Sequence, residues 1–401
     1  MKKELWNKLL FKYCNREVYS VFDQMKEFAF LIKIFYNETE KEETMKIFLT
    51  GEKQIGKSTC IQKFIDQNIV SVCGFLTKPL YEKDQRIGFY MHSLVEMERN
   101  DCRISIQHET YNEVIENIFN TFACEILDKS MQLKDHLLVL DEIGTMEKNE
   151  AKFIDRLYKA IEEHDNVLGV LKKKEAEHLT KIKQIKDVIV LNLDEISREA
   201  ALEMIQRAWF ESKGVGCVLL ASGNSSRFGS NKLLYELKGK RLVEIILDKL
   251  LQIPFRNVAV VSQYQPILKM AKERGFLSIE NLNPNLGLSH SIILGVEKLK
   301  DCQQIMFVLA DQPNLQVLTL RRLISESNHQ NIICAEAKGI IQNPMIFPQC
   351  YYDELLHLSG DRGAKIIALS HTVKRIKIDE KECCDVDEQC DIEQFYRNNI
   401  F

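Results

Sequence analysis

A glycine-rich stretch near the start of the chain has the residue types that bind phosphate. The segment GEKQIGKST has the spacing G-x-x-x-x-G-K-[ST] and follows an apolar run, KIFLT. In such a loop the backbone N–H groups point at phosphate oxygens, and a lysine places a positive charge beside them. The residues predicted to bind a nucleotide here are Gly51, Gly56, Lys57, Ser58 and Thr59.

Two consecutive acids follow another apolar run and suit a metal ligand and a base. In LLVLDEI, Asp141 and Glu142 stand at the predicted carboxyl end of a strand. Carboxylates at that position hold Mg²⁺ in phosphate-binding α/β folds, so we expect Asp141 and the Ser58 hydroxyl to bind the ion. Glu142 is then placed to orient or deprotonate an attacking water, as a catalytic residue.

A second loop of small residues, LLASGNSSRFGSNKLL, differs from the first. It lacks the G-K-[ST] signature, but Ala221, Ser222 and Gly223 are small enough for the backbone to approach a ligand closely. Arg227 and Lys232 are suited to neutralise a triphosphate and then the departing pyrophosphate. Taken alone, the stretch also fits a flexible basic turn. Later segments favour the phosphate-binding interpretation.

Acidic residues farther along the chain are predicted to join this second loop. Asp311 ends the apolar run FVLAD, and Asp385 lies in CCDVDEQCD near the carboxyl terminus. Both are predicted to bind Mg²⁺, and Asp311 is predicted to act in catalysis together with Arg227 and Lys232. We also expect the N-terminus of the helix after Gly287 to receive an anionic group, and QNPMIF to form a polar turn.

Composition and charge narrow the functional classes. Of the 401 residues 45% are hydrophobic and 28% are charged, with a formal net charge of −4. That weak negative charge argues against a general nucleic-acid-binding surface. The segment FAFLIKIFY is about half the length needed to span a bilayer and contains a lysine. With no signal peptide ahead of its 12 scattered cysteines, we expect a cytoplasmic protein with free thiols.

The predicted elements divide the chain into four segments. Residues 1–44 have apolar residues at helical spacing and predict a helical extension, and residues 209–214 form a polar linker. Residues 45–208 alternate strands with helices, including a long helix expected over residues 111–130, and the alternation restarts over residues 215–401. The predicted fold class is α/β, with two doubly wound three-layer domains that carry phosphate sites at the carboxyl ends of parallel strands.

The first domain resembles a known family. GEKQIGKST, VCGFLTKPLYEKDQRIGFYMHSL and VLDEIGTME are similar, in order and spacing, to the P-loop nucleoside-triphosphatase family first described from thermophiles. The resemblance covers most of residues 45–208. It implies hydrolysis of nucleoside triphosphates to diphosphates, with ATP or GTP as the substrate at this site. A second hypothesis stays open, in which this domain is a nucleotide-driven switch for handing over a cofactor.

The second domain resembles the MobA-like NTP transferases, and within them the molybdenum cofactor cytidylyltransferases. LLASGNSSRFGSNKLL, LADQP, GDRGA and DVDEQCD correspond to signatures of that family over nearly all of residues 215–396. The resemblance implies a Rossmann-like domain that transfers CMP from CTP to a molybdopterin-type cofactor, for delivery to a molybdoenzyme. It implies neither a nucleic acid nor a membrane as a partner. A sugar phosphate or an alcohol phosphate stays open as the acceptor.

Overall fold

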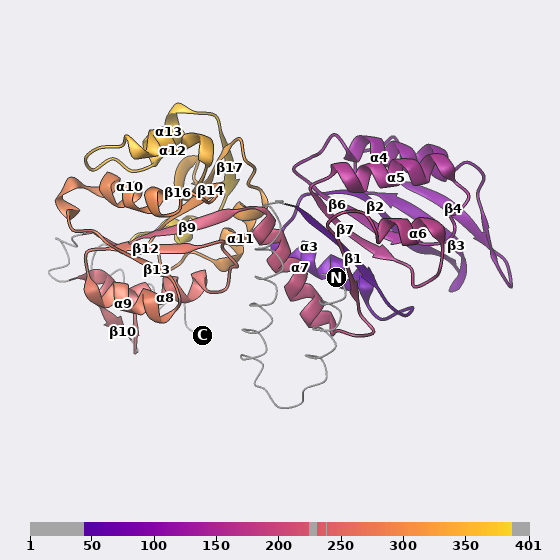
Figure 1. The fold of residues 1–401 in the computed structure, drawn as a ribbon, viewed down its shortest axis with the longest axis horizontal. Coiled ribbons are helices and arrows are strands. Elements are labelled where there is room, and N and C mark those ends of the chain that lie inside the picture. Colours follow the sequence, from indigo (N-terminus) through magenta and orange to yellow (C-terminus); the bar gives the residue numbers. More distant parts are fainter. Residues whose placement is uncertain (1–43, 224–230, 238, 387–401) are drawn as a thin grey trace. The chain divides into compact units, whose positions relative to one another are not determined.

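The computed structural model contains two α/β units, each with helices on both faces of one large sheet (Figure 1). This arrangement confirms the predicted fold class. The structure describes residues 44–223, 231–237 and 239–386. The N-terminal unit comprises the described part of residues 1–66 with residues 71–212, and the C-terminal unit comprises residues 67–70 with the described part of residues 213–401. The expected helical extension therefore lies outside the described residues, except for Thr44.

The sheet of the N-terminal unit has eight strands in the order β5-β4-β3-β2-β6-β7-β1-β8. Strands β2, β6, β7, β1 and β8 are parallel, and β3, β4 and β5 extend the sheet by antiparallel pairing. Runs such as LLVL and NVLGVL are buried throughout, because helices cover both faces of the parallel part. The strands are β1 Met45–Thr50, β2 Val72–Glu82, β3 Gln85–Ser93, β4 Asp101–Gln107, β5 Asn112–Val114, β6 Leu137–Ile143, β7 Asn166–Leu171 and β8 Val188–Asn192.

Helices α4 and α5 lie together on one face of this sheet, and α3 and α7 lie on the other (Figure 1). The long helix predicted over residues 111–130 is wrong in its first part. Asn112–Val114 pair with β4 instead, so the sheet edge satisfies their backbone groups, and the helical turns begin at Phe119. The helices are α3 Lys57–Asn68, the π-helix η1 Phe119–Ala123, α4 Cys124–Ser130, α5 Ala151–Glu163, α6 Glu177–Ile182 and α7 Arg198–Ser212.

The main sheet of the C-terminal unit has seven strands in the order β13-β12-β9-β14-β16-β15-β17. Strands β13, β12, β9 and β14 are parallel, whereas β16 runs antiparallel between β14 and β15. The prediction of a polar turn at QNPMIF is wrong, because these residues lie inside β16, where Met345, Ile346 and Phe347 are buried. The strands of this sheet are β9 Val215–Leu220, β12 Val258–Ser262, β13 Leu277–Glu280, β14 Gln304–Leu309, β15 Ile332–Ala337, β16 Ile340–Pro348 and β17 Val373–Lys377, and β10 Glu236–Leu237 and β11 Lys240–Arg241 form a separate antiparallel pair.

Helices α10, α12 and α13 lie on one face of the C-terminal sheet, and α8 and α9 lie on the other (Figure 1). The helices are α8 Leu242–Leu250, α9 Gln265–Glu273, α10 Leu288–Lys298, α11 Val317–Ser325, α12 Tyr352–Leu356 and α13 Lys365–Ser370. Short 3₁₀ turns are η2 Lys232–Leu234, η3 Pro284–Leu286, η4 Gln349–Tyr351 and η5 Glu380–Cys383. Because α7 ends at Ser212 and β9 begins at Val215, helix occupies the first part of the expected linker.

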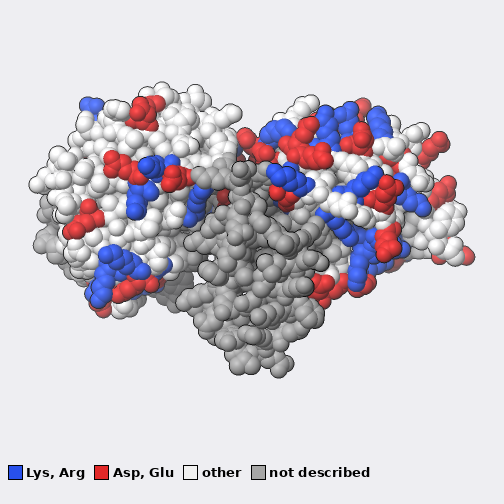
Figure 2. Space-filling view, viewed as in Figure 1, with Lys and Arg blue, Asp and Glu red and all other residues white. Residues whose placement is uncertain are grey.

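The surface carries both signs of charge. Figure 2 shows lysine and arginine interspersed with aspartate and glutamate on the face drawn, more densely on the N-terminal unit than on the C-terminal one. Among the described helices, none has the length and apolar character needed to cross a bilayer.

Candidate active sites

The glycine-rich loop connects β1 to α3 and wraps around its own lysine. The Lys57 ammonium is buried and donates hydrogen bonds to the carbonyl oxygens of Gly51, at 2.9 Å, and Glu52, at 2.8 Å. Gly56 has a φ of +99°, and a Cβ there would lie 2.8 Å from the side chain of Arg198. Only glycine suits both the backbone conformation and the space. The loop therefore places a positive charge at the N-terminus of α3, beside backbone N–H groups.

Asp141 stands at the carboxyl end of β6, facing this loop. Its carboxylate oxygen Oδ1 accepts a hydrogen bond from the Ser58 hydroxyl at 3.1 Å. Burial raises the pKa of Asp141 to about 6, although the hydrogen bond from Ser58 and the charges of Lys57 and Lys78 act in the opposite direction. A buried carboxylate beside a hydroxyl is a pair of oxygen donors that a divalent cation would stabilise, so these two residues fit Mg²⁺.

No group of three or more His, Cys, Asp and Glu side chains suited to a metal ion occurs in the parts of the chain that the structure describes. This does not conflict with a magnesium site for a nucleotide. Mg²⁺ retains several waters and binds one or two protein oxygens together with the phosphates of the substrate.

Glu142 follows Asp141 and is partly exposed. Its carboxylate lies 3.8 Å from the ammonium of Lys172, at the carboxyl end of β7. The buried Glu147 stabilises the turn after Glu142, because its carboxylate accepts a hydrogen bond from the backbone N–H of Gly144. Burial raises the pKa of Glu147. His178 contacts the Gly144 carbonyl oxygen at 2.8 Å and holds the same turn from α6.

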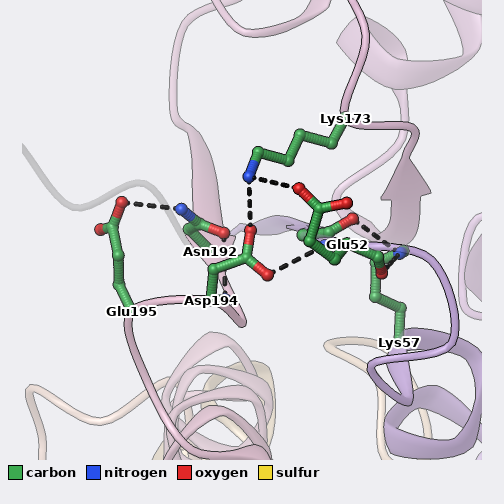
Figure 3. Close-up of polar contacts among 7 residues, drawn as sticks. Glu52, Lys57, Lys173, Asn192, Asp194 and Glu195 are labelled. Carbon is green, nitrogen blue, oxygen red and sulfur yellow. Dashed lines mark hydrogen bonds and ion pairs between the residues drawn. The ribbon is translucent and has the colours of Figure 1, made fainter.

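Two residues that the sequence interpretation missed hold the loop from outside. Figure 3 shows Asp194 and Lys173 beside Glu52 of the loop. Asp194 accepts a hydrogen bond from the Glu52 backbone N–H at 2.9 Å, and the Lys173 ammonium contacts both carboxylates, at 2.8 Å and 3.0 Å. Both follow apolar strand runs, β8 and β7, so polar residues at predicted strand ends were the available signal.

In the C-terminal unit, Lys232 and Asp311 face each other. The Lys232 ammonium lies 2.9 Å from the Asp311 carboxylate, and the two side chains are 11% and 25% exposed. Strands β9 and β14 are parallel neighbours, with Leu220 opposite Leu309, so the segments that follow them emerge together. The backbone N–H of Ala310 donates to the Leu220 carbonyl oxygen and continues this pairing by one residue.

Asp385 lies beside the same strand end. The side-chain amide of Gln312 donates to the Asp385 carboxylate at 2.9 Å and to the Cys383 carbonyl oxygen at 3.3 Å. The backbone N–H of Val386 donates to the Asp311 carbonyl oxygen at 3.0 Å. Gln312 is buried, and its Oε1 atom has no hydrogen-bond partner among the described residues. Carboxylate and amide oxygens are ligands that Mg²⁺ prefers, so these three side chains supply oxygen atoms of a kind that fits this ion.

The small residues after β9 leave an approach to the backbone. Ala221 is buried, and the Ser222 hydroxyl donates to the Val261 carbonyl oxygen at 3.2 Å. Among the described residues, a Cβ at Gly223 would meet nothing within 4 Å, and its carbonyl oxygen accepts a hydrogen bond from the Tyr264 hydroxyl. A ligand can therefore approach the chain closely at Gly223. Arg227 lies outside the described residues.

The N-terminus of α10 carries an acid from the protein itself. The Asp361 carboxylate accepts a hydrogen bond from the Leu288 backbone N–H at 3.3 Å, and Ser289 donates to the Gly360 carbonyl oxygen at 2.7 Å. Gly287, with a φ of +85°, packs against the backbone of Gly360. Asp361 thus caps this helix end with an acid of the protein itself, and the binding of a ligand's anionic group there stays a prediction.

A lysine of α8 holds the segment that follows Asp311. Lys249 of α8 donates to the carbonyl oxygens of Pro313, at 2.6 Å, and Leu315, at 2.8 Å. Burial lowers the pKa of Lys249. These two bonds fix the segment that follows Asp311 and Gln312, where the carbonyl groups would otherwise lack donors.

Comparisons with known proteins match each unit separately. The family model described as NTPase matches residues 46–206, and the model described as MobA-like NTP transferase domain matches residues 217–375. The nucleoside-triphosphatase THEP1 of Thermotoga maritima is 30% identical over 165 residues, which cover 40% of this chain and 93% of that protein.

Solved structures resemble the two parts as well. A nucleotidyl transferase from Methanothermobacter thermautotroptrophicus is 20% identical and covers 46% of this chain and 99% of its own, with a TM-score of 0.41. THEP1 from Aquifex aeolicus is 21% identical and covers 40% of this chain and 99% of its own, with a TM-score of 0.33.

The phosphate-binding loop and its facing acid therefore lie in a segment that matches a nucleoside-triphosphatase over nearly that relative's whole length, and the Lys232–Asp311 pair lies in a segment matched by a transferase model. Residues 217–375 match the model of the MobA-like NTP transferase domain, and through residues 46–206 the chain belongs to the NTPase family.

Proposed function

We propose that the C-terminal domain transfers CMP from CTP to the terminal phosphate of a molybdopterin-type cofactor. An oxygen of the acceptor phosphate attacks the α-phosphorus and forms a new P–O bond. The P–O bond between the α- and β-phosphates breaks, and pyrophosphate leaves with that electron pair. The observation that carries the proposal is the apposition, at 2.9 Å, of Lys232 in the turn η2 and Asp311 in the segment after β14, the parallel neighbour of β9.

Each residue of this site has a role set by its charge. Lys232 would bind the triphosphate and neutralise the departing pyrophosphate, and Arg227 would assist it. Asp311 and Asp385 would hold Mg²⁺, which when bound supplies positive charge to the phosphates. Gln312 keeps the Asp385 carboxylate in place through the bond at 2.9 Å. Ala221, Ser222 and Gly223 would line the path of the nucleotide, which would approach the backbone most closely at the exposed Gly223.

The N-terminal domain is a nucleoside-triphosphatase domain by family, and we propose ATP or GTP as its substrate. Gly51, Gly56 and Thr59 would surround the phosphates, and Lys57 would place its charge beside them. Ser58 and Asp141, whose oxygens are 3.1 Å apart, would hold Mg²⁺. Glu142 would orient the attacking water and receive its proton.

The two reactions release different products, which allows them to be measured separately. Pyrophosphate release is followed over CTP, GTP, ATP and UTP, with and without molybdopterin, in the Lys57→Ala variant to suppress hydrolysis. We expect release with CTP only when molybdopterin is present. If release requires a sugar phosphate or an alcohol phosphate, that compound and not molybdopterin is the acceptor. If release is faster with GTP than with CTP, GTP is the nucleotide donor. Absence of release with every donor and every acceptor would refute nucleotidyl transfer.

A further inference from the structure

Three consecutive lysines follow β7, the strand that lies between β6 and β1 in the N-terminal sheet. Strand β7 pairs with β6, which carries Asp141 and Glu142, and with β1, which leads into the phosphate-binding loop. Parallel strands present their carboxyl ends at one edge of the sheet, so the residues that follow β7 lie between the loop and the acids. Those residues are Lys172, Lys173 and Lys174.

Lys172 is directed to the side of the acids. Its ammonium lies 3.8 Å from the Glu142 carboxylate, and its backbone N–H donates to the Ile143 carbonyl oxygen at 2.9 Å. A Cβ added at Gly144 would lie 3.3 Å from the Lys172 Cδ and 3.9 Å from its Nζ, so the side chain lies across this glycine. The Lys172 side chain is 40% exposed, which leaves its ammonium accessible to a second partner.

Lys173 is directed to the side of the loop, so the two neighbours have different tasks. Its ammonium contacts the carboxylates of Glu52, at 2.8 Å, and Asp194, at 3.0 Å (Figure 3). These two acids raise the pKa of Lys173. With two anionic partners Lys173 is committed to holding the loop, whereas the ammonium of Lys172 is the more available to a substrate.

We propose that Lys172 is a second phosphate-contacting lysine of the N-terminal site, which bridges the Glu142 carboxylate and the terminal phosphate of the nucleotide. This inference depends on the nucleoside-triphosphatase reaction of that domain. An ammonium has three N–H donors and can hold two oxygen acceptors at once. Glu142, the proposed general base, adjoins Asp141, whose carboxylate lies 3.1 Å from the Ser58 hydroxyl. Asp141 and Ser58 are the proposed magnesium ligands, so Lys172 would contact the phosphate between the general base and the metal ion.

The bridge assists hydrolysis in two ways. The water oxygen attacks the terminal phosphorus, the P–O bond to the diphosphate breaks, and the proton of the water passes to Glu142. Lys172 stays protonated throughout. Its charge offsets the negative charge on the terminal phosphate oxygens in the transition state, and its contact keeps the Glu142 carboxylate directed at the water. A lysine that acts in this way contacts triphosphates but not diphosphates.

The test compares Lys172→Met with Lys172→Arg, and uses Lys174→Met as a matched control on an exposed neighbour. Turnover is measured by phosphate release, and dissociation constants are measured for a diphosphate and for a non-hydrolysable triphosphate. For Lys172→Met we expect turnover to fall about 100-fold, as after loss of one stabilising donor. We also expect triphosphate binding to weaken about 10-fold while diphosphate binding stays unchanged. Lys172→Arg should retain the triphosphate preference, and Lys174→Met should behave as the wild type.

Two outcomes would overturn the proposal. Wild-type turnover and binding in Lys172→Met would show that the pair with Glu142 is an ordinary surface ion pair, which contributes little. Equal weakening of diphosphate and triphosphate binding would show a structural role. If the wild type binds triphosphate without hydrolysing it, the proposed hydrolysis fails, and the ratio of the two dissociation constants still tests Lys172.

Discussion

Each of the two candidate phosphate sites has a lysine and an aspartate, but the lysine is held by different means in each. In the N-terminal domain the ammonium of Lys57 is enclosed by carbonyl groups of its own loop, and the buried Asp141 contacts Ser58. In the C-terminal domain Lys232 pairs directly with Asp311, and both side chains are partly accessible. The lysine of the first site is therefore held by its own loop, whereas the lysine of the second is held by an acid far away in the chain.

Because of this difference, the two sites depend on different contacts. Enclosing Lys57 in a loop of a few residues requires particular backbone conformations, such as the φ of +99° at Gly56, and these depend on the local sequence. The pair of Lys232 and Asp311 requires that β9 and β14 be neighbours, and that Gln312 and Lys249 hold the segment after Asp311. Substitutions should thus affect the two sites independently and through different contacts.

The largest expected effect is on hydrolysis. Lys57→Ala removes the charge at the loop, and we expect phosphate release to fall by roughly 100- to 1,000-fold. Pyrophosphate release from CTP and molybdopterin should not change. Lys63→Ala, on an exposed position of α3, is the matched control and should preserve both activities. Loss of both activities in folded Lys57→Ala protein would contradict independent sites.

The converse substitution should separate the sites in the other direction. Asp311→Asn removes the carboxylate that faces Lys232, and pyrophosphate release should fall roughly 100- to 1,000-fold, as after loss of one stabilising charge. Phosphate release by the N-terminal domain should stay at the wild-type level. Asp301→Asn, in the exposed turn before β14, serves as the control. Unchanged transfer in Asp311→Asn would remove this residue from the mechanism.

The buried carboxyl group of Asp141, in the N-terminal site, should make the free energy of unfolding depend on pH. The Asp141 pKa rises from 3.8 to about 6, so its contribution to the free energy of unfolding falls as pH rises from 4 through 6. With a chelator present at pH 8, we expect Asp141→Asn to raise the free energy of unfolding by about 1–2 kcal/mol. This is less than the value obtained by converting the whole pKa shift at about 1.36 kcal/mol per pKa unit. Urea titration at pH 4.5 should show only about a third of that gain, because there the folded carboxyl is mostly protonated while the unfolded one is mostly ionised. A gain of the same size at both values would assign it to another cause.

The amide of Gln312 should affect transfer without affecting stability. Gln312→Leu removes the donor to Asp385 together with the amide oxygen that has no described partner. The loss of two hydrogen bonds, to Asp385 and to the Cys383 carbonyl oxygen, is offset by the loss of one unsatisfied buried atom, so the free energy of unfolding should change little. Pyrophosphate release should fall about tenfold, and the Mg²⁺ concentration at half-maximal rate should rise. Gln330→Leu, at an exposed turn, should change neither rate nor Mg²⁺ dependence.

The smallest effect is expected at the outer support of the loop. Asp194→Ala removes the acceptor for the Glu52 N–H, and triphosphate binding by the N-terminal domain should weaken by about two- to fivefold, a modest effect for an exposed interaction. Asp194→Asn keeps an oxygen acceptor and should recover most of the affinity. Calorimetric titration measures both. Glu195→Ala provides the neighbouring control, and a loss as large as that of Asp194→Ala would point to a general disturbance of the turn.

The sequence predicted strands better where both faces are buried than at the sheet edges. The apolar runs of β1, β6, β9 and β14 were recognised because continuous burial leaves a continuous apolar pattern. Asn112–Val114 carry no such pattern, and only pairing with β4 makes them a strand. The polar residues at the start of QNPMIF led to the prediction of a turn, although these residues belong to β16. That strand is stabilised by its two antiparallel neighbours, β14 and β15. Propensity could not supply these tertiary partners.

The sequence by itself determined the phosphate-binding loop, because its glycines, lysine and hydroxyl residues act within nine consecutive positions, 51–59. It also placed Asp141 and Asp311 at strand ends. Only the tertiary structure decided that Lys232 meets Asp311, that Gln312 meets Asp385, and that Lys172 and Lys173 serve different sides of one site. Those contacts follow from strand order and register, which place residues distant in sequence within hydrogen-bonding range and which no local pattern specifies.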